Sequence, residues 1–202
     1  MNRLVVFVKA PRPGLVKTRL AAVLGQKAAS AAYCKLVEKL LEQLAPLDEV
    51  ELCFAPDDAE AELRPWLRRG WTLVPQGQGD LGARLHRAFE SEFLAGAESV
   101  VAIGSDCPEV TVEDIESAWQ ALRSHDVVLG PASDGGYWLI GLKQPDPRLF
   151  DGMAWSTETV LAQTMERCRS AGLCVNLLRQ LDDIDTEEDW RRFLQRTGQG
   201  EQ

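Results

Sequence analysis

The sequence predicts an α/β fold of three layers, α/β/α, in which a mostly parallel central sheet lies between helices. Short apolar runs alternate with longer stretches of helical period. The runs are rich in β-branched residues, which is typical of strands buried on both faces. The chain has 202 residues, of which 45% are apolar and 26% charged, a globular composition. We expect one domain over residues 1–202, large enough to hold a core without disulfides.

The first half of the chain supplies three strands and two helices. Leu4–Val8 is apolar throughout and predicts a buried strand. Lys27–Leu44 has helical period and length, and Val50–Ala55 is again a short apolar run. Asp58–Arg69 is predicted as the second helix. Thr72–Val74 closes this half as a brief β-branched strand.

The middle of the chain continues the alternation. Leu81–Leu94 predicts a helix, and Val100–Ile103 predicts a buried strand. Val112–Arg123 has helical period, whereas Val127–Leu129 and Tyr137–Leu142 are short and apolar. Such alternation predicts right-handed crossovers and a ligand crevice beyond the carboxyl ends of the strands.

The last third predicts two helices around one strand. Thr157–Ala171 has helical period, and Ser156 or Thr157 is the expected N-cap. Leu173–Leu178 is the last predicted strand. Thr186–Arg196 begins with Thr186 as N-cap, and acids in its first turn complement the helix dipole. We expect the final residues, Thr197–Gln202, to fray.

Charge and cysteine content exclude several classes of protein. The net charge of −9 argues against nucleic acid or an anionic membrane as a partner. Residues 1–37 nevertheless contain seven basic residues and no acid. Five cysteines without a CxxC pair disfavour a disulfide framework and a zinc site, which predicts a reducing cytoplasm. No apolar run approaches the roughly 20 residues of a membrane span.

The loop after the first strand, Lys9–Leu20, has the composition of a phosphate-binding loop. Backbone N–H groups at a helix N-terminus bind phosphate oxygens together with cationic side chains. A solvated basic turn is the alternative. A Walker loop is excluded, because Val16 and Pro11 stand where it requires glycine. The candidate nucleotide-binding residues here are Lys9, Pro11, Gly14, Lys17 and Arg19.

A second loop, Gln76–Leu85, contains three glycines that let the backbone approach a flat or anionic ligand. Gly79, Asp80 and Arg84 are its candidate nucleotide-binding residues. The alternative is a flexible loop in which Asp80 caps the next helix, and both roles are compatible.

Two aspartates are the candidate metal ligands. Asp106 follows a buried strand and precedes Cys107 and Pro108, and a carboxylate held at a strand end suits Mg²⁺ or Mn²⁺. A turn in which Asp106 only satisfies backbone amides is the alternative. Asp185 lies in a run of like charges that repel one another unless a cation is near, so it is the second expected ligand. Cys107 is expected to be a small buried residue.

An Asp-Gly-Gly turn joins the predicted strands Val127–Leu129 and Tyr137–Leu142. A plain hairpin explains its glycines, and a pocket wall for a small acceptor is compatible with the hairpin. The candidate acceptor-binding residues are Pro131, Asp134, Gly135, Gly136 and Tyr137. His86 and His125 lack a partner pattern, so a hydrolase with a catalytic triad is not expected.

These motifs together resemble the nucleotide-diphospho-sugar transferase superfamily, with its GT-A type fold. Within it the chain is similar to bacterial glycosyltransferase-like proteins that share the patterns K-x-P-x-x-G-x-x-K-T-R-L, G-D-L-G-x-R-L, G-S-D-C-P and D-G-G-Y. All four occur in order from Lys9 onward, and Asp183–Thr186 matches the D-x-D-T start of the last helix. The resemblance covers about nine tenths of the chain.

The resemblance implies a transferase with a nucleotide donor. Asp106-Cys-Pro108 is similar to the D-x-P turn of small nucleotidyltransferases such as molybdenum-cofactor and phospholactate guanylyltransferases. Glycosyltransferases more often carry D-x-D, and Gly104 stands at its first position here. We therefore expect nucleotidyl transfer from a nucleoside triphosphate with pyrophosphate release, in which Lys17 and Asp106 are catalytic. Glycosyl transfer from a sugar nucleotide is the alternative, and a non-catalytic nucleotide-binding module comes third. A homodimer stays open.

Overall fold

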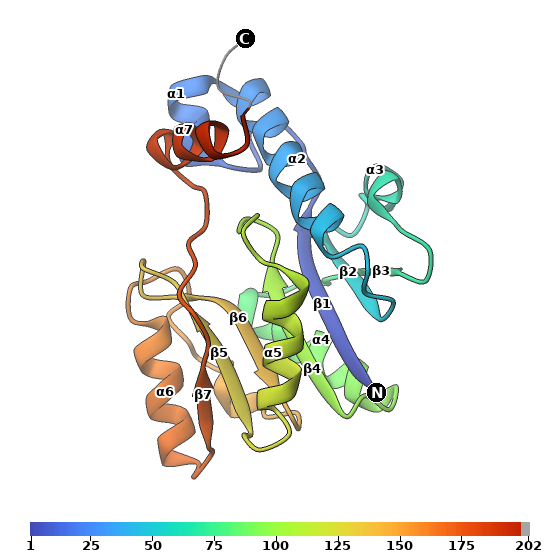
Figure 1. Cartoon of the computed structure of the whole chain (residues 1–202), viewed down its shortest axis with the longest axis vertical. Coiled ribbons are helices and arrows are strands. Elements are labelled where there is room, and N and C mark those ends of the chain that lie inside the picture. Colours follow the sequence, from blue (N-terminus) through green and yellow to red (C-terminus); the bar gives the residue numbers. More distant parts are fainter. Residues whose placement is uncertain (199–202) are drawn as a thin grey trace.

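Seven strands form one sheet in the computed structural model, which describes residues 1–198. The spatial order is β3-β2-β1-β4-β6-β5-β7, and β6 runs antiparallel to both of its neighbours while the other pairings are parallel (Figure 1). The strands span β1 Asn2–Lys9, β2 Val50–Ala55, β3 Thr72–Pro75, β4 Ser99–Gly104, β5 Val127–Pro131, β6 Tyr137–Leu142 and β7 Val175–Leu177. The predicted fold class is confirmed.

Helices cover both faces of this sheet. Their bounds are α1 Thr18–Leu24, α2 Gln26–Gln43, α3 Glu60–Leu63, α4 Leu81–Leu94, α5 Val112–Ala121, α6 Val160–Ser170 and α7 Glu187–Arg196, with 3-10 turns η1 Arg64–Trp66 and η2 Pro147–Leu149. One buried cluster joins α2 and α5 to the sheet, and a second joins α4 and α6 to the opposite face. This arrangement gives the three layers that the sequence predicts.

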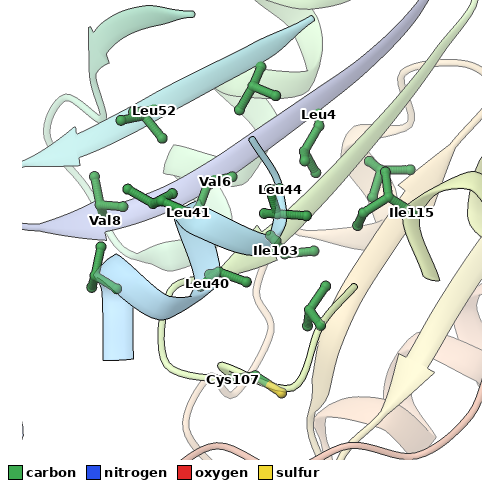
Figure 2. Close-up of a cluster of buried hydrophobic side chains, with 14 of the residues drawn as sticks. Leu4, Val6, Val8, Leu40, Leu41, Leu44, Leu52, Ile103, Cys107 and Ile115 are labelled. Atoms are coloured by element: carbon green, nitrogen blue, oxygen red, sulfur yellow. The ribbon is translucent and has the colours of Figure 1, made fainter. Parts of the chain in front are cut away.

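Alternating residues of β1 divide between the two faces. Leu4, Val6 and Val8 are fully buried against α2 and α5 (Figure 2). Val5 belongs to the buried cluster on the opposite face, which contains residues of α4. Burying a Leu or Val side chain contributes about 1.5 to 3 kcal/mol, so a central strand that is apolar on both faces fixes the middle of the sheet. Because β1 to β4 pair in parallel, their carboxyl ends face the same side of the molecule.

A third, smaller core lies at that side, where α7 packs on α1 and α2 (Figure 1). Leu20 and Leu36 are fully buried there, and the ring of Trp190 stacks on Phe193 at 5.5 Å. The C-terminal helix therefore returns to the amino-terminal segment. The sequence did not predict α1 as a separate helix; Gly25, at φ +85°, separates it from α2.

Two helix predictions need correction. The predicted helix Asp58–Arg69 is replaced by the four-residue α3 and the turn η1, because Pro65 cannot donate a backbone hydrogen bond and Leu67 is extended. The predicted start of the helix Thr157–Ala171 is also wrong, since α6 begins at Val160 without a side-chain cap.

The reason for the late start of α6 is a tertiary contact. Ser156 adopts a left-handed backbone conformation, and the hydroxyl of Thr157 donates to the carbonyl of Ala154, so neither residue caps the helix. Instead the N–H of Leu161, in the first turn, donates to the carbonyl of Gly135 at 2.9 Å. A backbone carbonyl 26 positions earlier in the chain thus satisfies a first-turn amide of α6, and the helix begins without the predicted side-chain cap.

Other local predictions are confirmed. Asp80 caps α4 by accepting from the N–H of Ala83 at 2.9 Å, and Thr186 forms a capping box with Asp189 at the start of α7. β5 and β6 form an antiparallel hairpin through the Asp-Gly-Gly turn. The last strand is shorter than predicted, Val175–Leu177. Of the residues expected to fray, 199–202 lie outside the described part of the chain.

Across residues 1–198, no helix combines the length and the apolar character needed to cross a membrane. The cytoplasmic location and the single domain over residues 1–202 stay predictions.

Candidate active site

Three segments that are far apart in sequence meet at the carboxyl ends of the strands. They are the loop from β1 to α1, the turn after β4, and the segment between β7 and α7. The N–H of Ile184 donates to the carbonyl of Asp106 at 3.1 Å, which ties the last segment to the turn after β4. The structure thus brings together Lys17, Asp106 and Asp185.

Lys17 lies at the centre of this group. It is the N-cap of α1 in a left-handed conformation, φ 48° and ψ 49°, and its side chain is only 2% exposed. The Nζ atom donates to Asp185 Oδ1 at 2.8 Å and lies 3.2 Å from Asp106 Oδ2. A left-handed non-glycine residue is uncommon and costs about 1 kcal/mol or more, and such strain clusters at functional sites.

The two aspartates combine protein contact with access to solvent. Their side chains are 38% exposed for Asp106 and 42% for Asp185. Arg19, which is 78% exposed, approaches Asp185 Oδ2 with Nη1 at 3.7 Å. An open side therefore remains on which a ligand can reach both carboxylates and the guanidinium.

The group of Lys17, Asp106 and Asp185 has one positive and two negative side chains. Burial lowers the pKa of the Lys17 ammonium, but Asp106 and Asp185 outweigh this effect and the net shift is upward. Part of Asp183 faces solvent, yet protein atoms crowd its carboxyl. This crowding, together with the charges of Asp106 and Asp185, raises the pKa of Asp183 to about 7 against the opposing effect of Lys17. An added cation would relieve this repulsion.

The donor set fits Mg²⁺ that is shared with a substrate. No group of three or more acidic, histidine or cysteine side chains within residues 1–198 is arranged to hold a metal ion. Mg²⁺ often uses only one or two protein carboxylates and fills its other positions with water and phosphate oxygens. Asp106 and Asp185 supply those two carboxylates on either side of the Lys17 ammonium, and water or phosphate oxygens would complete the coordination of the metal.

The other residues of the loop between β1 and α1 make contacts outside the group of Lys17, Asp106 and Asp185. Lys9 is exposed at the end of β1, and the carbonyl of Pro11 accepts a hydrogen bond from the hydroxyl of Ser30 on α2. Gly14 has φ +85°, a conformation that glycine permits. Arg12 binds Asp58 and Glu62 instead of facing the aspartates.

The second loop is held from both ends by arginines. Arg84 donates from Nε to the carbonyl of Gly79 and from Nη1 to Gln76 Oε1, both at 3.0 Å. Arg87 donates to the carbonyls of Gln76 and Gln78. Arg84, a candidate ligand of the nucleotide, therefore braces this loop in the structure, and Gly79 adopts φ +107° beside it.

The candidate acceptor residues do not all face one surface. The carbonyl of Pro131 accepts from Leu181, and Asp134 Oδ1 accepts from the N–H of Gly136 at 2.9 Å. The N–H of Ser133, the neighbour of Asp134, donates to Asp182 Oδ1 at 2.8 Å, which brings this turn against the segment that carries Asp185. Tyr137 instead packs into the core beneath α6. Gly135 touches the backbone of Glu158, where a Cβ atom would lie 2.0 Å from the carbonyl oxygen.

Two buried hydroxyls at the site were not identified from the sequence. Tyr33 on α2 and Ser105, directly before Asp106, share a hydrogen bond of 2.9 Å. Helical periodicity marks Tyr33 only as a core residue, so no local signal could have identified this contact. Cys107 is 1% exposed, and burial raises the pKa of its thiol to about 12, which confirms it as a packing residue (Figure 2).

Sequence comparison finds two informative relatives. The chain is 31% identical over 201 residues to 3-phospho-D-glycerate guanylyltransferase of Phenylobacterium zucineum, which covers 90% of this chain and 86% of that protein. It is 29% identical over 126 residues to phosphoenolpyruvate guanylyltransferase of Chloroflexus aggregans, a match that spans only 61% of each protein. Both relatives carry the names of nucleotidyltransferases.

Solved structures agree on the fold, and a family model identifies the chain. A candidate nucleotide-diphospho-sugar transferase from Desulfovibrio desulfuricans G20 superposes with a TM-score of 0.90 at 35% identity, covering 97% of this chain and 87% of that one. Molybdopterin-guanine dinucleotide biosynthesis protein A from Archaeoglobus fulgidus has a TM-score of 0.60 at 16% identity, covering 98% and 99%, and shares the fold alone. Residues 40–157 match the family described as "Uncharacterized protein conserved in bacteria (DUF2064)", and the chain belongs to this family.

Proposed function

We propose that this protein is a Mg²⁺-dependent nucleotidyltransferase that transfers a nucleoside monophosphate from a nucleoside triphosphate to a small acceptor. The observation that carries the proposal is the ion-pair group in which the buried ammonium of Lys17 lies between the carboxylates of Asp106 and Asp185. The two relatives named as guanylyltransferases support nucleotidyl transfer and make GTP the first donor to test.

The residues divide between metal and phosphates. Asp106 and Asp185 would hold Mg²⁺, and Lys17 and Arg19 would bind the phosphate oxygens of the donor. When bound, the metal supplies neutralisation of the charge on the phosphates. An oxygen of the acceptor attacks the α-phosphorus, the bond from this phosphorus to the bridging oxygen of the β-phosphate breaks, and pyrophosphate leaves. Positioning and charge stabilisation suffice for this chemistry, so it needs no histidine base.

The names of the relatives also suggest the class of acceptor. 3-Phospho-D-glycerate and phosphoenolpyruvate are both small phosphorylated carboxylic acids. We propose the same class here, with the surface around Asp134 and Gly136 as the acceptor side.

Glycosyl transfer is the second candidate, because the Desulfovibrio protein that is 35% identical is described as a candidate nucleotide-diphospho-sugar transferase. The two functions release different products. Nucleotidyl transfer from GTP releases pyrophosphate, whereas glycosyl transfer from a GDP-sugar releases GDP.

The test is product analysis of the purified protein with Mg²⁺. It is incubated with each nucleoside triphosphate or with GDP-sugars, in the presence of 3-phosphoglycerate or phosphoenolpyruvate, and pyrophosphate and GDP are measured. The proposal expects pyrophosphate from a triphosphate, lost in EDTA and in Asp106→Asn. The control Asp48→Asn changes an exposed aspartate before β2 and keeps wild-type turnover. GDP release without pyrophosphate would favour glycosyl transfer, and pyrophosphate release by Asp106→Asn would contradict the assigned site.

A further inference from the structure

Tyr33 connects the two loops that form the candidate site. It lies on α2, is 2% exposed, and reaches the carboxyl ends of β1 and β4. The backbone N–H of Lys9 donates to its hydroxyl oxygen at 2.8 Å, and the same hydroxyl shares a hydrogen bond of 2.9 Å with the hydroxyl of Ser105. One side chain therefore contacts the last residue of β1 and the residue that precedes Asp106.

Each residue that shares a hydrogen bond with Tyr33 precedes a member of the ion-pair group in the chain. Lys9 begins the loop that ends at Lys17, and Ser105 is joined to Asp106 by a peptide bond. Ser30, one turn earlier on α2, donates to the carbonyl of Pro11 in the same loop. The amino-terminal half of α2 thus holds the loop of Lys17, and through Tyr33 it also holds the turn of Asp106.

The hydrogen bond between Tyr33 and Ser105 is buried. Ser105 is 4% exposed, so its hydrogen bond to Tyr33 does not compete with bulk water. The Tyr33 ring also contacts the edge of Trp66 at a centroid distance of 6.2 Å. Burial, with a smaller contribution from the charge of Asp106, raises the pKa of the phenol. Tyr33 therefore keeps its proton, and either of the two hydroxyls can donate in the bond between Tyr33 and Ser105.

We propose that Tyr33 is a positioning residue that sets Asp106 relative to the loop of Lys17 through its hydrogen bonds to Ser105 and to the backbone of Lys9. This inference rests on the proposed function, because it assigns Tyr33 to the orientation of a metal-holding carboxylate. Tyr33 is buried and acts through Ser105 and Lys9. Residues that orient a metal ligand without binding the metal typically change metal affinity or activity by about 10- to 100-fold when they are mutated.

The alternative is a Tyr33 that only packs in the core. Loss of a buried hydrogen bond then lowers stability by about 1 kcal/mol and leaves the site unchanged. The two roles are separated by measuring metal affinity and the kinetic constants in variants that lose the same type of bond at different places.

The variants are Tyr33→Phe, Ser105→Ala, the double variant and the control Ser99→Ala. Tyr33→Phe keeps the ring and removes only the hydroxyl. Ser99 is also buried and belongs to β4, but it lies at the opposite end and bonds to Asn2 Oδ1 at 2.9 Å. Ser99→Ala therefore reports the stability cost of a buried serine without a change at the site.

The first measurement is the affinity of the protein alone for Mn²⁺, followed by electron paramagnetic resonance. We expect Tyr33→Phe and Ser105→Ala each to bind Mn²⁺ about 10- to 100-fold more weakly than wild type, while Ser99→Ala binds it as wild type does. Because Tyr33 and Ser105 act through one shared bond, the double variant should be no weaker than the weaker single variant. Ser105→Ala decides the question if Tyr33→Phe does not fold.

The second measurement is pyrophosphate release at saturating Mg²⁺. Tyr33→Phe should lower kcat about 10-fold or more and change the KM for GTP little, since the phosphate-binding cations remain. Wild-type Mn²⁺ affinity in both single variants, additive losses in the double variant, or wild-type protein that binds no Mn²⁺ would each overturn the inference. Wild-type protein that binds Mn²⁺ but releases no pyrophosphate would instead refute the proposed function, and the Mn²⁺ series would still decide the role of Tyr33.

Discussion

Lys17 shows at the residue scale how one side chain organises the candidate site. Its ammonium is buried between two carboxylates that are themselves partly exposed. Removing one partner of such a group leaves the other charges uncompensated. In the proposed function the same ammonium would also bind the phosphates of the donor.

Lys17→Met tests this role. Methionine keeps an unbranched side chain of similar length and removes the charge. We expect kcat for pyrophosphate release to fall about 100-fold or more, as for the loss of one electrostatic group at a transition state. The control Lys35→Met removes an exposed charge from α2 and should keep wild-type kcat. Turnover of Lys17→Met within threefold of wild type would remove Lys17 from the mechanism.

Glu51 shows a different effect of burial, at the end of the sheet away from the site. It is 7% exposed on β2, beside Glu92, which is 6% exposed and lies 3.1 Å from Arg3. Burial, and then the charge of Glu92, raises the pKa of Glu51 to about 8 from an ordinary 4.5. The folded state therefore retains a proton that the unfolded chain releases above pH 4.5, and stability must fall as the pH rises from about 4.5 to about 8.

Glu51→Gln should remove this part of the pH dependence, because the amide does not titrate. Each pKa unit between the folded and unfolded states corresponds to about 1.4 kcal/mol, so the variant gains on wild type by a few kcal/mol between pH 5 and pH 8. Urea unfolding at several pH values measures the difference. The exposed control Glu90→Gln should follow the wild-type curve. Parallel curves for Glu51→Gln and wild type would show that Glu51 ionises normally.

At the scale of elements, the segment between β7 and α7 carries Asp185 to the site. Hydrogen bonds from Leu178 to Leu129, from Leu181 to Pro131 and from Ile184 to Asp106 fasten it along its length. Beyond it, α7 packs on α1 and α2 through Trp190 and Phe193. Docking of α7 therefore holds Asp185 from one side and the start of α1, at Lys17, from the other.

Trp190→Ala tests whether α7 supports the site. Truncating a buried Trp costs about 3 to 5 kcal/mol, and here the loss falls on the contact that holds α7. We expect lower stability in urea and, at a temperature where the variant is folded, a raised KM for GTP. Trp119→Ala on α5, whose indole donates to the carbonyl of Arg3 at the other end of the sheet, should lose stability with an unchanged KM. Equal KM values for the two variants would show that packing of α7 does not support the site.

The elements also show what the sequence could predict. Strands such as Val100–Ile103 and caps such as Asp80 and Thr186 were predicted correctly, because burial on both faces and local capping leave clear patterns. The start of α6 was not predicted correctly, because the N–H of Leu161 in its first turn donates to the carbonyl of Gly135, which is distant in the sequence. The bridge from Tyr33 to Ser105 was missed for the same reason, since a contact over 72 positions has no local pattern.

For the whole molecule, the order of strands explains how a basic loop meets distant acids. β1 and β4 are parallel neighbours, so the loop that begins at Lys9 and the turn that contains Asp106 leave the sheet at the same edge. Residues 1–37 contain seven basic residues and no acid, and all 31 acids follow. The fold places part of that positive charge against part of the negative charge, and the candidate site lies at this contact.

A crystal structure with Mn²⁺ and a GTP analogue whose α–β bridge resists cleavage tests the central claim most directly. We predict an anomalous peak for Mn²⁺ at the carboxylates of Asp106 and Asp185, with the ammonium of Lys17 shifted from between them onto the phosphates beside Arg19. A metal and nucleotide bound elsewhere, or phosphates in place with no metal at these aspartates, would contradict the account.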